Sequence, residues 1–254
     1  MEMTSYKPGT PSWVDLGSPD QDESAAFYGA VFGWDIPEGP PEAGGYRMCL
    51  LRGKPVAGLG RQQAPDIPPY WTTYVSVSDL DATVRAVEAG GGQLVVPAMD
   101  VLKEGRMAVF ADPTGAPFSA WQPGDHIGSG YANEPGAVSW NELVTRNTDR
   151  AIVFYSEVFG WTADAQGMGD ITYTVWMLDG NPVGGMMPMG DQWPAEVPPH
   201  WAVYFAVEDT DATVAKVTAL GGSVVVPPQD IPQGRFAGFS DPHGAMFNVI
   251  ALAG

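Results

Sequence analysis

The sequence predicts an α+β protein made of two tandem copies of one domain, each built from two paired strand-helix-strand-strand-strand units. Two observations lead to this prediction. Short motifs from the first half recur in the same order in the second half, and strand-like and helix-like stretches alternate twice within each half. A stretch rich in glycine, asparagine and serine separates the copies. We therefore expect half one at residues 8–123, a linker at 124–134 and half two at 135–252.

The repeat rests on residues that keep their order and nearly their spacing. The second copy of each motif follows the first by 127, 129 or 130 positions, so the intervening loops differ by only a few residues. Chance does not produce so many matches in one order. The first copy comprises Ser12, Trp13, Phe27, Tyr28, Phe32, Gly33, Trp34, Asp79, Asp81, Ala82, Thr83, Val84, Phe110, Asp112, Pro113, Gly115 and Ala116. The second comprises Ser139, Trp140, Phe154, Tyr155, Phe159, Gly160, Trp161, Asp209, Asp211, Ala212, Thr213, Val214, Phe239, Asp241, Pro242, Gly244 and Ala245.

The first unit of half one opens with a strand expected at 12–17. Residues 19–31 predict a helix, because acidic residues stand near its start and apolar residues recur on one face. Gly33 is expected to end this helix. Further strands are expected at 46–51 and 55–59.

The second unit of half one repeats the same order. A strand at 71–77 leads into a helix at 79–89, which has acidic residues in its first turn and is followed by three glycines. Strands are then expected at 93–96, 107–111 and 117–121. Because half two carries the same motifs, the chain should contain four such units.

The charge balance restricts the partners. Thirty acidic residues stand against twelve Lys and Arg, for a net charge of −18. Such a surface repels phosphate backbones and anionic membranes, so we expect neither a nucleic-acid nor a membrane partner. The same charge attracts cationic small molecules, although solubility alone is another reason for an acidic surface.

Location and assembly can be predicted only in outline. Cys49 is the single cysteine, so no intrachain disulfide and no cysteine-based zinc cluster can form. Residues 1–9 do not read as a secretion signal, and no apolar run has the length of a membrane span. We expect a cytoplasmic protein that is a monomer or a homodimer.

The unit order and the repeated motifs together resemble the glyoxalase/bleomycin-resistance/dioxygenase family, also called the vicinal oxygen chelate superfamily. The matching motifs are Phe-Tyr followed by Phe-Gly-Trp, Val-x-Asp-x-Asp-Ala, and Phe-x-Asp-Pro-x-Gly. They cover nearly the whole chain, twice. The resemblance implies that the two units of each half form a cupped mixed sheet around a cavity. It says little about the reaction, because this fold hosts many functions.

The resemblance also allows a test for the metal that many members bind. Counted from the motifs, the family's metal-ligand positions hold Trp13, Thr72 and Ser119 in half one, and Trp140, Ala202 and Asn248 in half two. A divalent metal needs several His or carboxylate donors that converge on one point. We therefore expect no metal and no other cofactor. His126, His200 and His243 do not restore the set.

Aromatic and acidic residues stand where the metal would be bound. Strand alternation places Trp13 and Asp15 on one face, and Trp140 and Glu142 repeat the pair. Two alternatives remain: the tryptophans fill the cavities as core, or the acids pair with an arginine such as Arg47. The predicted pocket lining is Trp13, Asp15, Tyr74, Ser119, Trp121, Trp140, Glu142, Trp176, Ala202, Tyr204 and Asn248, with half two favoured.

Three functions are compatible with this pattern. The first is a metal-free binding protein that sequesters a planar aromatic natural product or antibiotic, preferably a cationic one, because tryptophan faces and a carboxylate suit such a ligand. The second is a glyoxalase-like lyase or isomerase, or another enzyme of this superfamily acting on a small metabolite, with Asp15 or Glu142 as general base. The third is an interaction protein with filled cavities.

Overall fold

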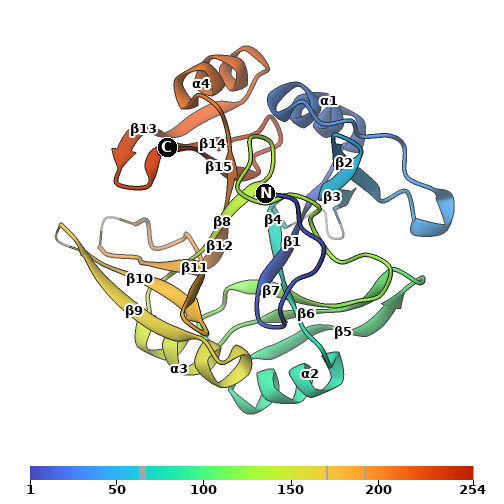
Figure 1. The fold of residues 1–254 in the computed structure, drawn as a ribbon. Coiled ribbons are helices and arrows are strands. Elements are labelled where there is room, and N and C mark those ends of the chain that lie inside the picture. The colour runs from blue at the N-terminus through green and yellow to red at the C-terminus, as the bar shows by residue number, and fades with distance from the viewer. Residues whose placement is uncertain (63–66, 170, 192, 254) are drawn as a thin grey trace.

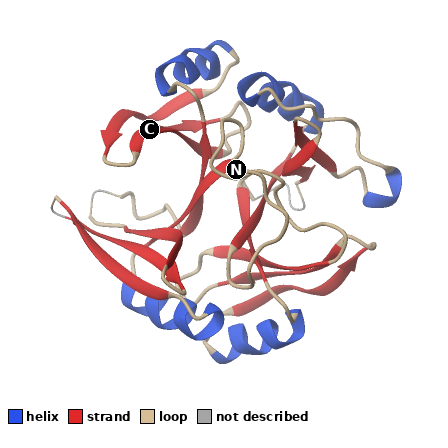
Figure 2. Ribbon diagram, in the orientation of Figure 1, coloured by secondary structure: helices blue, strands red, loops and turns tan. Residues whose placement is uncertain are grey.

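The computed structural model describes residues 1–62, 67–169, 171–191 and 193–253, and in it each half forms one curved mixed sheet with two α-helices (Figures 1 and 2). The predicted α+β class and the tandem duplication are confirmed. None of the described helices has the length and apolar character that crossing a membrane requires.

The half-one sheet has the strand order β2-β3-β1-β4-β7-β6-β5. β1 joins the two units, because it pairs in parallel with β3 on one side and antiparallel with β4 on the other. The elements are β1 (Pro11–Ser18), α1 (Gln21–Phe32), the short 3-10 helix η1 (Pro41–Ala43), β2 (Arg47–Leu51), β3 (Lys54–Arg61), β4 (Trp71–Ser76), α2 (Leu80–Ala89), β5 (Gln93–Val101), β6 (Gly105–Ala111) and β7 (Pro117–Pro123).

The half-two sheet has the order β13-β14-β15-β12-β8-β11-β10-β9. β8 takes the place of β1, pairing in parallel with β11 and antiparallel with β12. The elements are β8 (Val138–Thr145), α3 (Thr148–Phe159), β9 (Thr162–Met168), β10 (Ile171–Leu178), β11 (Asn181–Pro188), β12 (His200–Ala206), α4 (Thr210–Ala219), β13 (Ser223–Ile231), β14 (Gly234–Ser240) and β15 (Met246–Leu252).

The prediction of four identical units is wrong for the first one. Half two has β9 directly after α3, whereas the segment after α1 has only an isolated bridge between Asp35 and Leu50 and the short helix η1. The sequence explains the difference, because residues 36–45 contain three prolines and three glycines. Proline cannot donate to a strand ladder, and glycine weakens one.

The helices begin and end where the repeated motifs indicate. Asp79 and Asp209 accept hydrogen bonds from the first-turn N–H groups of α2 and α4. Gly33 and Gly160 end α1 and α3 at φ of 74° and 70°, in the left-handed region that favours glycine. The Phe-Gly-Trp motif is therefore a helix stop that carries the chain straight back into the core.

The two sheets share their apolar cores. In Figure 1, α1 lies beside α4 at one end of the molecule and α2 beside α3 at the other. One core joins α1 and β1 of half one to β12, β14 and β15 of half two, and the other joins α2 and β7 to α3 and β10. At the centre, Thr73 on β4 donates to the Asn141 side chain on β8 at 2.9 Å. The convex faces therefore lie back to back.

Two symmetry-related hydrogen bonds cross between the halves. The Tyr28 hydroxyl on α1 donates to Asp241 of half two at 2.9 Å, and the Tyr155 hydroxyl on α3 donates to Asp112 of half one at 2.9 Å. Both carboxyls are at least 95% buried. Burial, then the nearby carboxyl, raises the pKa of each tyrosine well above its usual value, so both stay protonated as donors. The repeated Phe-Tyr and Asp-Pro-x-Gly motifs thus bind each other across the junction.

The motif tryptophans add a second link. The Trp34 indole donates to the carbonyl of Gly136, and the Trp161 indole donates to the carbonyl of Gly9, both at 2.7 Å. Both rings are at most 5% exposed. The motif tryptophan of each half therefore holds the backbone just before the first strand of the other half.

We expect Tyr155→Phe to lower the free energy of unfolding by about 1–3 kcal/mol, because it leaves the buried Asp112 carboxyl and the Trp201 indole without their partner. Urea denaturation measures the change. Tyr131→Phe is the control, because the Tyr131 hydroxyl has no hydrogen bond to a described residue. Equal effects of the two substitutions would contradict a special role for the crossing bond.

Candidate functional site

The concave face of half one carries a chain of hydrogen bonds that ends on a carboxylate. The indole of Trp13 donates to the Tyr46 hydroxyl at 3.0 Å, and that hydroxyl donates to Oδ2 of Asp15 at 3.0 Å. The same oxygen accepts from the Tyr74 hydroxyl at 2.8 Å. We call these four side chains, from β1, β4 and the segment at the start of β2, the half-one frame.

Half two repeats this arrangement with a longer acid. The indole of Trp140 donates to the Tyr173 hydroxyl at 2.8 Å, and the Tyr204 hydroxyl donates to Oε1 of Glu142 at 3.0 Å. Tyr173 also lies beside the Glu142 carboxyl. These four side chains form the half-two frame. Each of its members follows its counterpart in half one by 127 or 130 positions.

A glycine makes room for each frame. Gly58 on β3 lies beside Asp15, and a Cβ built there would come 1.7 Å from the Tyr46 hydroxyl. Gly185 on β11 lies beside Glu142, and a Cβ there would come 1.8 Å from the Tyr173 hydroxyl and 2.7 Å from the Trp140 indole nitrogen. Any larger residue would push the tyrosine away from the acid.

The pKa values of both frame acids are raised, which favours the neutral form of each carboxyl. Burial raises the pKa of Asp15 to about 6, against the lowering effect of hydrogen bonds from Tyr74, Tyr46 and Thr72. Burial also raises the pKa of Glu142, where only the two tyrosines of its frame oppose the shift. A protonated carboxyl can donate a hydrogen bond as well as accept one.

The two acids differ in how fully they are engaged. Thr72 lies opposite Asp15, whereas Ala202 takes the same position opposite Glu142. Asp15 therefore has three hydroxyl partners, and Glu142 has two. Glu142 keeps hydrogen-bonding capacity for a further group.

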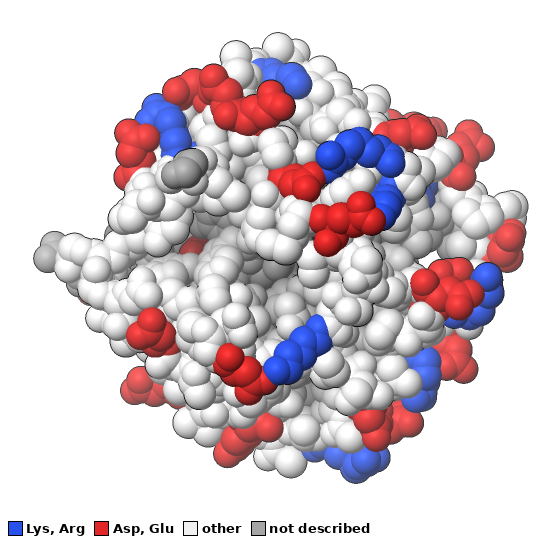
Figure 3. All heavy atoms as spheres, in the orientation of Figure 1, with Lys and Arg blue, Asp and Glu red and all other residues white. Residues whose placement is uncertain are grey.

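The tryptophans of the two frames differ in exposure, whereas the acids differ in the opposite sense, since Asp15 is partly exposed and Glu142 is buried. Trp13, Tyr74 and Trp121 are each only 6% exposed and pack with Met48, Val101 and Met107. In half two, Trp140 and Tyr204 remain partly exposed. Figure 3 shows a hollow on this side of the molecule, between the β13 region and the region of β9 and β10. We call the space bounded by the half-two frame, Phe236 and Asn248 the half-two pocket.

Most of the predicted lining residues come together. Each set lies on the concave face of one sheet, and its part in ligand binding remains a prediction. In half one these residues are Trp13, Asp15, Tyr74, Ser119 and Trp121. In half two they are Trp140, Glu142, Ala202, Tyr204 and Asn248.

Trp176 is the exception, and its predicted place in the pocket is wrong. Its ring is fully buried in the core between the halves, 5.6 Å from Trp161 and 5.7 Å from Tyr155 between ring centroids. Successive strand side chains alternate between faces, so on β10 it is Tyr173 that faces the pocket. Cys49, the half-one counterpart of Trp176, is buried in the same kind of core.

Sequence reasoning missed several members of the site. Tyr46 and Tyr173 stand 127 positions apart, the shift of the first motif group, and this signal could have found them. Phe236, whose ring lies 6.2 Å from that of Tyr204, occupies the position of Met107. His126 is buried against Trp13, and no sequence pattern marks it.

Among the described residues, no arginine forms an ion pair with Asp15 or Glu142. Arg47 pairs with the exposed Asp22 at the start of α1, away from Asp15. Two of the histidines also lie outside the frames. His200 begins β12 and contacts Trp193, while His243 lies 3.4 Å from Glu23.

The frame side chains do not suit the divalent metal that many members of the family bind. Both frame indoles use their N–H as hydrogen-bond donors to tyrosine and offer no lone pair. Each pocket contains a single carboxyl, and the described residues hold no group of three His, Cys, Asp or Glu side chains suited to a metal ion.

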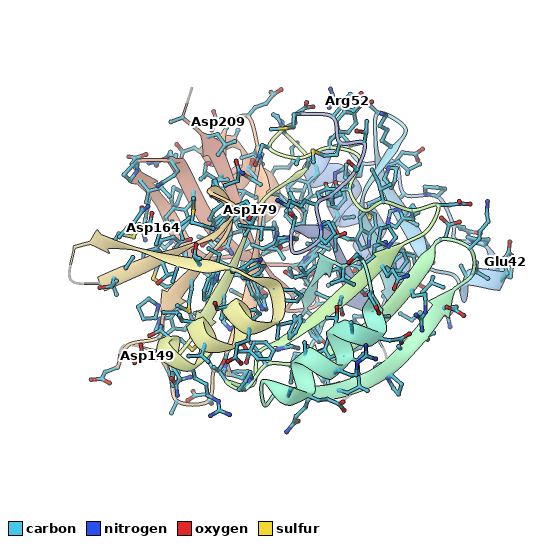
Figure 4. All side chains as sticks on the ribbon, turned by 60° about the horizontal axis from the view of Figure 1, so that its bottom comes forward. Glu42, Arg52, Asp149, Asp164, Asp179 and Asp209 are labelled. Carbon is cyan, nitrogen blue, oxygen red and sulfur yellow. The ribbon has the colours of Figure 1, made fainter. Side chains whose placement is uncertain are left out.

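Other surface features are separate from the frames. A hollow of about 450 Å³ lies at the start of α1, lined in part by Asp20, Asp22 and Arg47, and one of about 290 Å³ lies between α2 and the end of α3. The acids labelled in Figure 4, such as Asp149 on α3 and Asp164 on β9, are exposed on the outer surface.

The duplicated fold agrees with the comparison to known families. The chain belongs to the Glyoxalase/Bleomycin resistance protein/Dioxygenase superfamily, which residues 10–119 and 136–249 each match. The resemblance expected from the motifs is therefore confirmed.

Relatives with named roles match over nearly the whole chain. "Putative glyoxylase CFP32" of Mycobacterium bovis is 44% identical over 261 residues, covering 99% of this chain and 98% of the relative. "Anthracycline biosynthesis protein DnrV" of Streptomyces peucetius is 43% identical over 265 residues, covering 98% and 96%. Among solved structures, the Mn(II)-bound glyoxalase of Novosphingobium aromaticivorans has a TM-score of 0.68 at 19% identity, covering 96% of this chain and 82% of that one. The last likeness concerns the fold alone.

We expect Asp15→Asn to change how stability depends on pH. The folded-state pKa of about 6 lies above the ordinary value of 3.8, so the cost of burying ionised Asp15 is absent below about pH 4 and complete above about pH 6. Because asparagine does not ionise, the variant should gain up to about 3 kcal/mol relative to wild type between pH 4 and pH 7. Urea denaturation at both pH values measures this, and parallel pH profiles would contradict it.

We expect Gly185→Ala to displace Tyr173 and break its hydrogen bond to Trp140, at a cost of roughly 1–3 kcal/mol from overpacking. Near-UV circular dichroism and tryptophan fluorescence report the change. Gly167→Ala on β9 is the matched control, because a Cβ there meets nothing within 4 Å. A Gly185→Ala spectrum identical to wild type would show that the frame does not need this glycine.

Proposed function

We propose that this protein binds a planar polycyclic aromatic small molecule in the half-two pocket, without a metal ion, and sequesters it in the cytoplasm. One observation carries the proposal: the half-two frame is fully formed but remains partly exposed. A Trp face, two phenols, a phenyl ring and one carboxyl lie together there, and all of these side chains except the carboxyl remain partly exposed.

The frame supplies two kinds of attraction. The Trp140 indole is fixed by its hydrogen bond to Tyr173, so its face is preorganised for stacking, which contributes about 0.5–1.5 kcal/mol per aromatic pair beyond area burial. Glu142 has one hydroxyl partner fewer than Asp15 and can receive a hydroxyl or ammonium group of the ligand. Together they favour an aromatic ring system that carries a hydrogen-bond donor.

The charge of the protein favours cationic ligands. Half two contains only four basic residues, Arg146, Arg150, Lys216 and Arg235. Arg235 is engaged by Asp211 and Asp230, and Arg146 donates to the backbone of the 194–197 segment. Acidic residues therefore dominate the field around the pocket and raise the encounter rate with cations, an effect that salt reduces.

The name of one relative is compatible with the same ligand class. The name of the Streptomyces relative, anthracycline biosynthesis protein, refers to planar polycyclic aromatic compounds, and that protein is 43% identical to this chain over nearly its full length. We extend the class, a polycyclic aromatic natural product or antibiotic, to this protein.

A second candidate function is catalysis in the same pocket. The raised pKa of Glu142 and its two phenol neighbours suit a group that takes a proton from a bound small metabolite and returns it, as a lyase or isomerase requires. The name of the mycobacterial relative, which includes the word glyoxylase, favours this alternative. Mass spectrometry of ligand recovered after long incubation separates the two functions, because sequestration returns it unchanged.

We expect Trp140→Ala to raise the dissociation constant of proflavine, a planar aromatic cation, by up to about tenfold through loss of the stacking face. Glu142→Gln should instead reduce the preference for proflavine over anthraquinone-2-sulfonate, a planar anion, because it keeps the shape and removes the negative charge. Fluorescence titration measures both.

Glu157→Gln is the control for charge, since it removes one acid from the exposed face of α3. It should leave the cation preference almost unchanged. Unaltered proflavine affinity in Trp140→Ala would exclude the half-two frame as the binding site.

A further inference from the structure

His126 belongs to the linker, yet its ring is buried in the half-one pocket. Only 9% of the residue is exposed. The imidazole stands edge-on to Trp13 at 4.5 Å and to Trp121 at 5.7 Å between ring centroids, spacings typical of T-shaped aromatic pairs. The ring therefore lies against the frame tryptophan, where a planar ligand would lie in half two.

The backbone holds this ring in place from several sides. The carbonyl of His126 accepts from the Trp121 indole at 2.8 Å, and its N–H donates to the carbonyl of Glu104 at 3.1 Å. A few residues later, the N–H of Ser129 donates to the carbonyl of Ser12 on β1 at 2.8 Å. The linker is thus fixed to both units of half one, and the position of the ring is specified.

One nitrogen of the buried ring is unused. Nε2 of His126 has no hydrogen-bond partner among the described residues. Burial lowers the pKa of His126 to about 4, so the ring is neutral at physiological pH. Burying an unpaired polar atom costs free energy, and an apolar side chain would avoid that cost. The half-one pocket therefore accommodates a neutral heteroaromatic ring whose polar atom the protein leaves unsatisfied.

Half two has the frame without the filling ring. Ile250 stands at the position of Trp121, and among the described residues no aromatic ring pairs with Trp140 as His126 pairs with Trp13. Both tryptophans donate to a frame tyrosine in the same way, so the difference in exposure between Trp13 and Trp140 follows from what covers them.

We propose that half one holds a second binding site for planar heteroaromatic molecules, which His126 fills, so that the wild-type protein binds one ligand per chain, in half two. The statement about half two rests on the proposed function. The filling of half one by His126 stands independently of it.

The first test removes the filling ring and returns it as a free molecule. His126→Gly should lower the melting temperature, and 4-methylimidazole, which matches the missing side chain, should restore it saturably and change tryptophan fluorescence. Wild type should not respond. His200→Gly is the control, because it removes a histidine outside the pocket and should not be rescued. A folded His126→Gly protein without a saturable response would overturn the proposal.

The second test counts sites in protein that keeps His126. Proflavine should bind wild type at one per chain, and Ala202→Trp, which fills the half-two pocket opposite Glu142, should abolish binding. Two sites in wild type, or a full site surviving in Ala202→Trp, would overturn the closure of half one even if His126→Gly does not fold. If no variant binds proflavine, the proposed function fails, and the response to 4-methylimidazole alone decides the closure.

Discussion

The arrangement of the two halves depends on a buried hydrogen bond that a tyrosine of each half donates to a carboxyl of the other. Tyr28 and Tyr155 bind carboxyls that already hold tight turns through backbone N–H groups, so each hydrogen bond fixes a helix, a turn and the junction at once. Because both bonds lie on the convex side of the sheets, they hold the helices between the two convex faces. The concave faces are left to point outward, in opposite directions, and that is where the polar frames lie.

Within each cupped sheet, a carboxyl on the central strand determines what surrounds it. Two phenols and an indole are needed to bury it, and a glycine on the neighbouring strand is needed to admit one of the phenols. Asp15 has three hydroxyl partners, the two phenols and Thr72, and the tryptophan beside it is buried. Glu142 is one methylene longer and faces Ala202, so it has one hydroxyl partner fewer than Asp15 and can accept a further hydrogen bond.

The sequence was a good guide to the fold, because the Gly33 helix stop and the Asp79 cap act locally and the repeat showed each twice. The acids and tryptophans of the frames followed from strand alternation on β1 and β8. The placement of Trp176 failed because its strand was assigned without a register, and a shift of one residue reverses the face. His126 could not be found, since its position depends on how the linker folds back over a pocket formed by distant strands.

Because the two pockets lie on opposite sides of the molecule, equivalent mutations in the two halves should have different effects. Loss of the Trp13 or Trp121 ring in half one opens a packed interior, so its effect falls on stability. Under the proposed function, loss of the Trp140 ring in half two removes a partly exposed side chain and acts on ligand affinity more than on stability. Duplication has thus given the chain two copies of one cup, so that, under the proposed function, one copy can change its ligand while the other maintains the fold that both require.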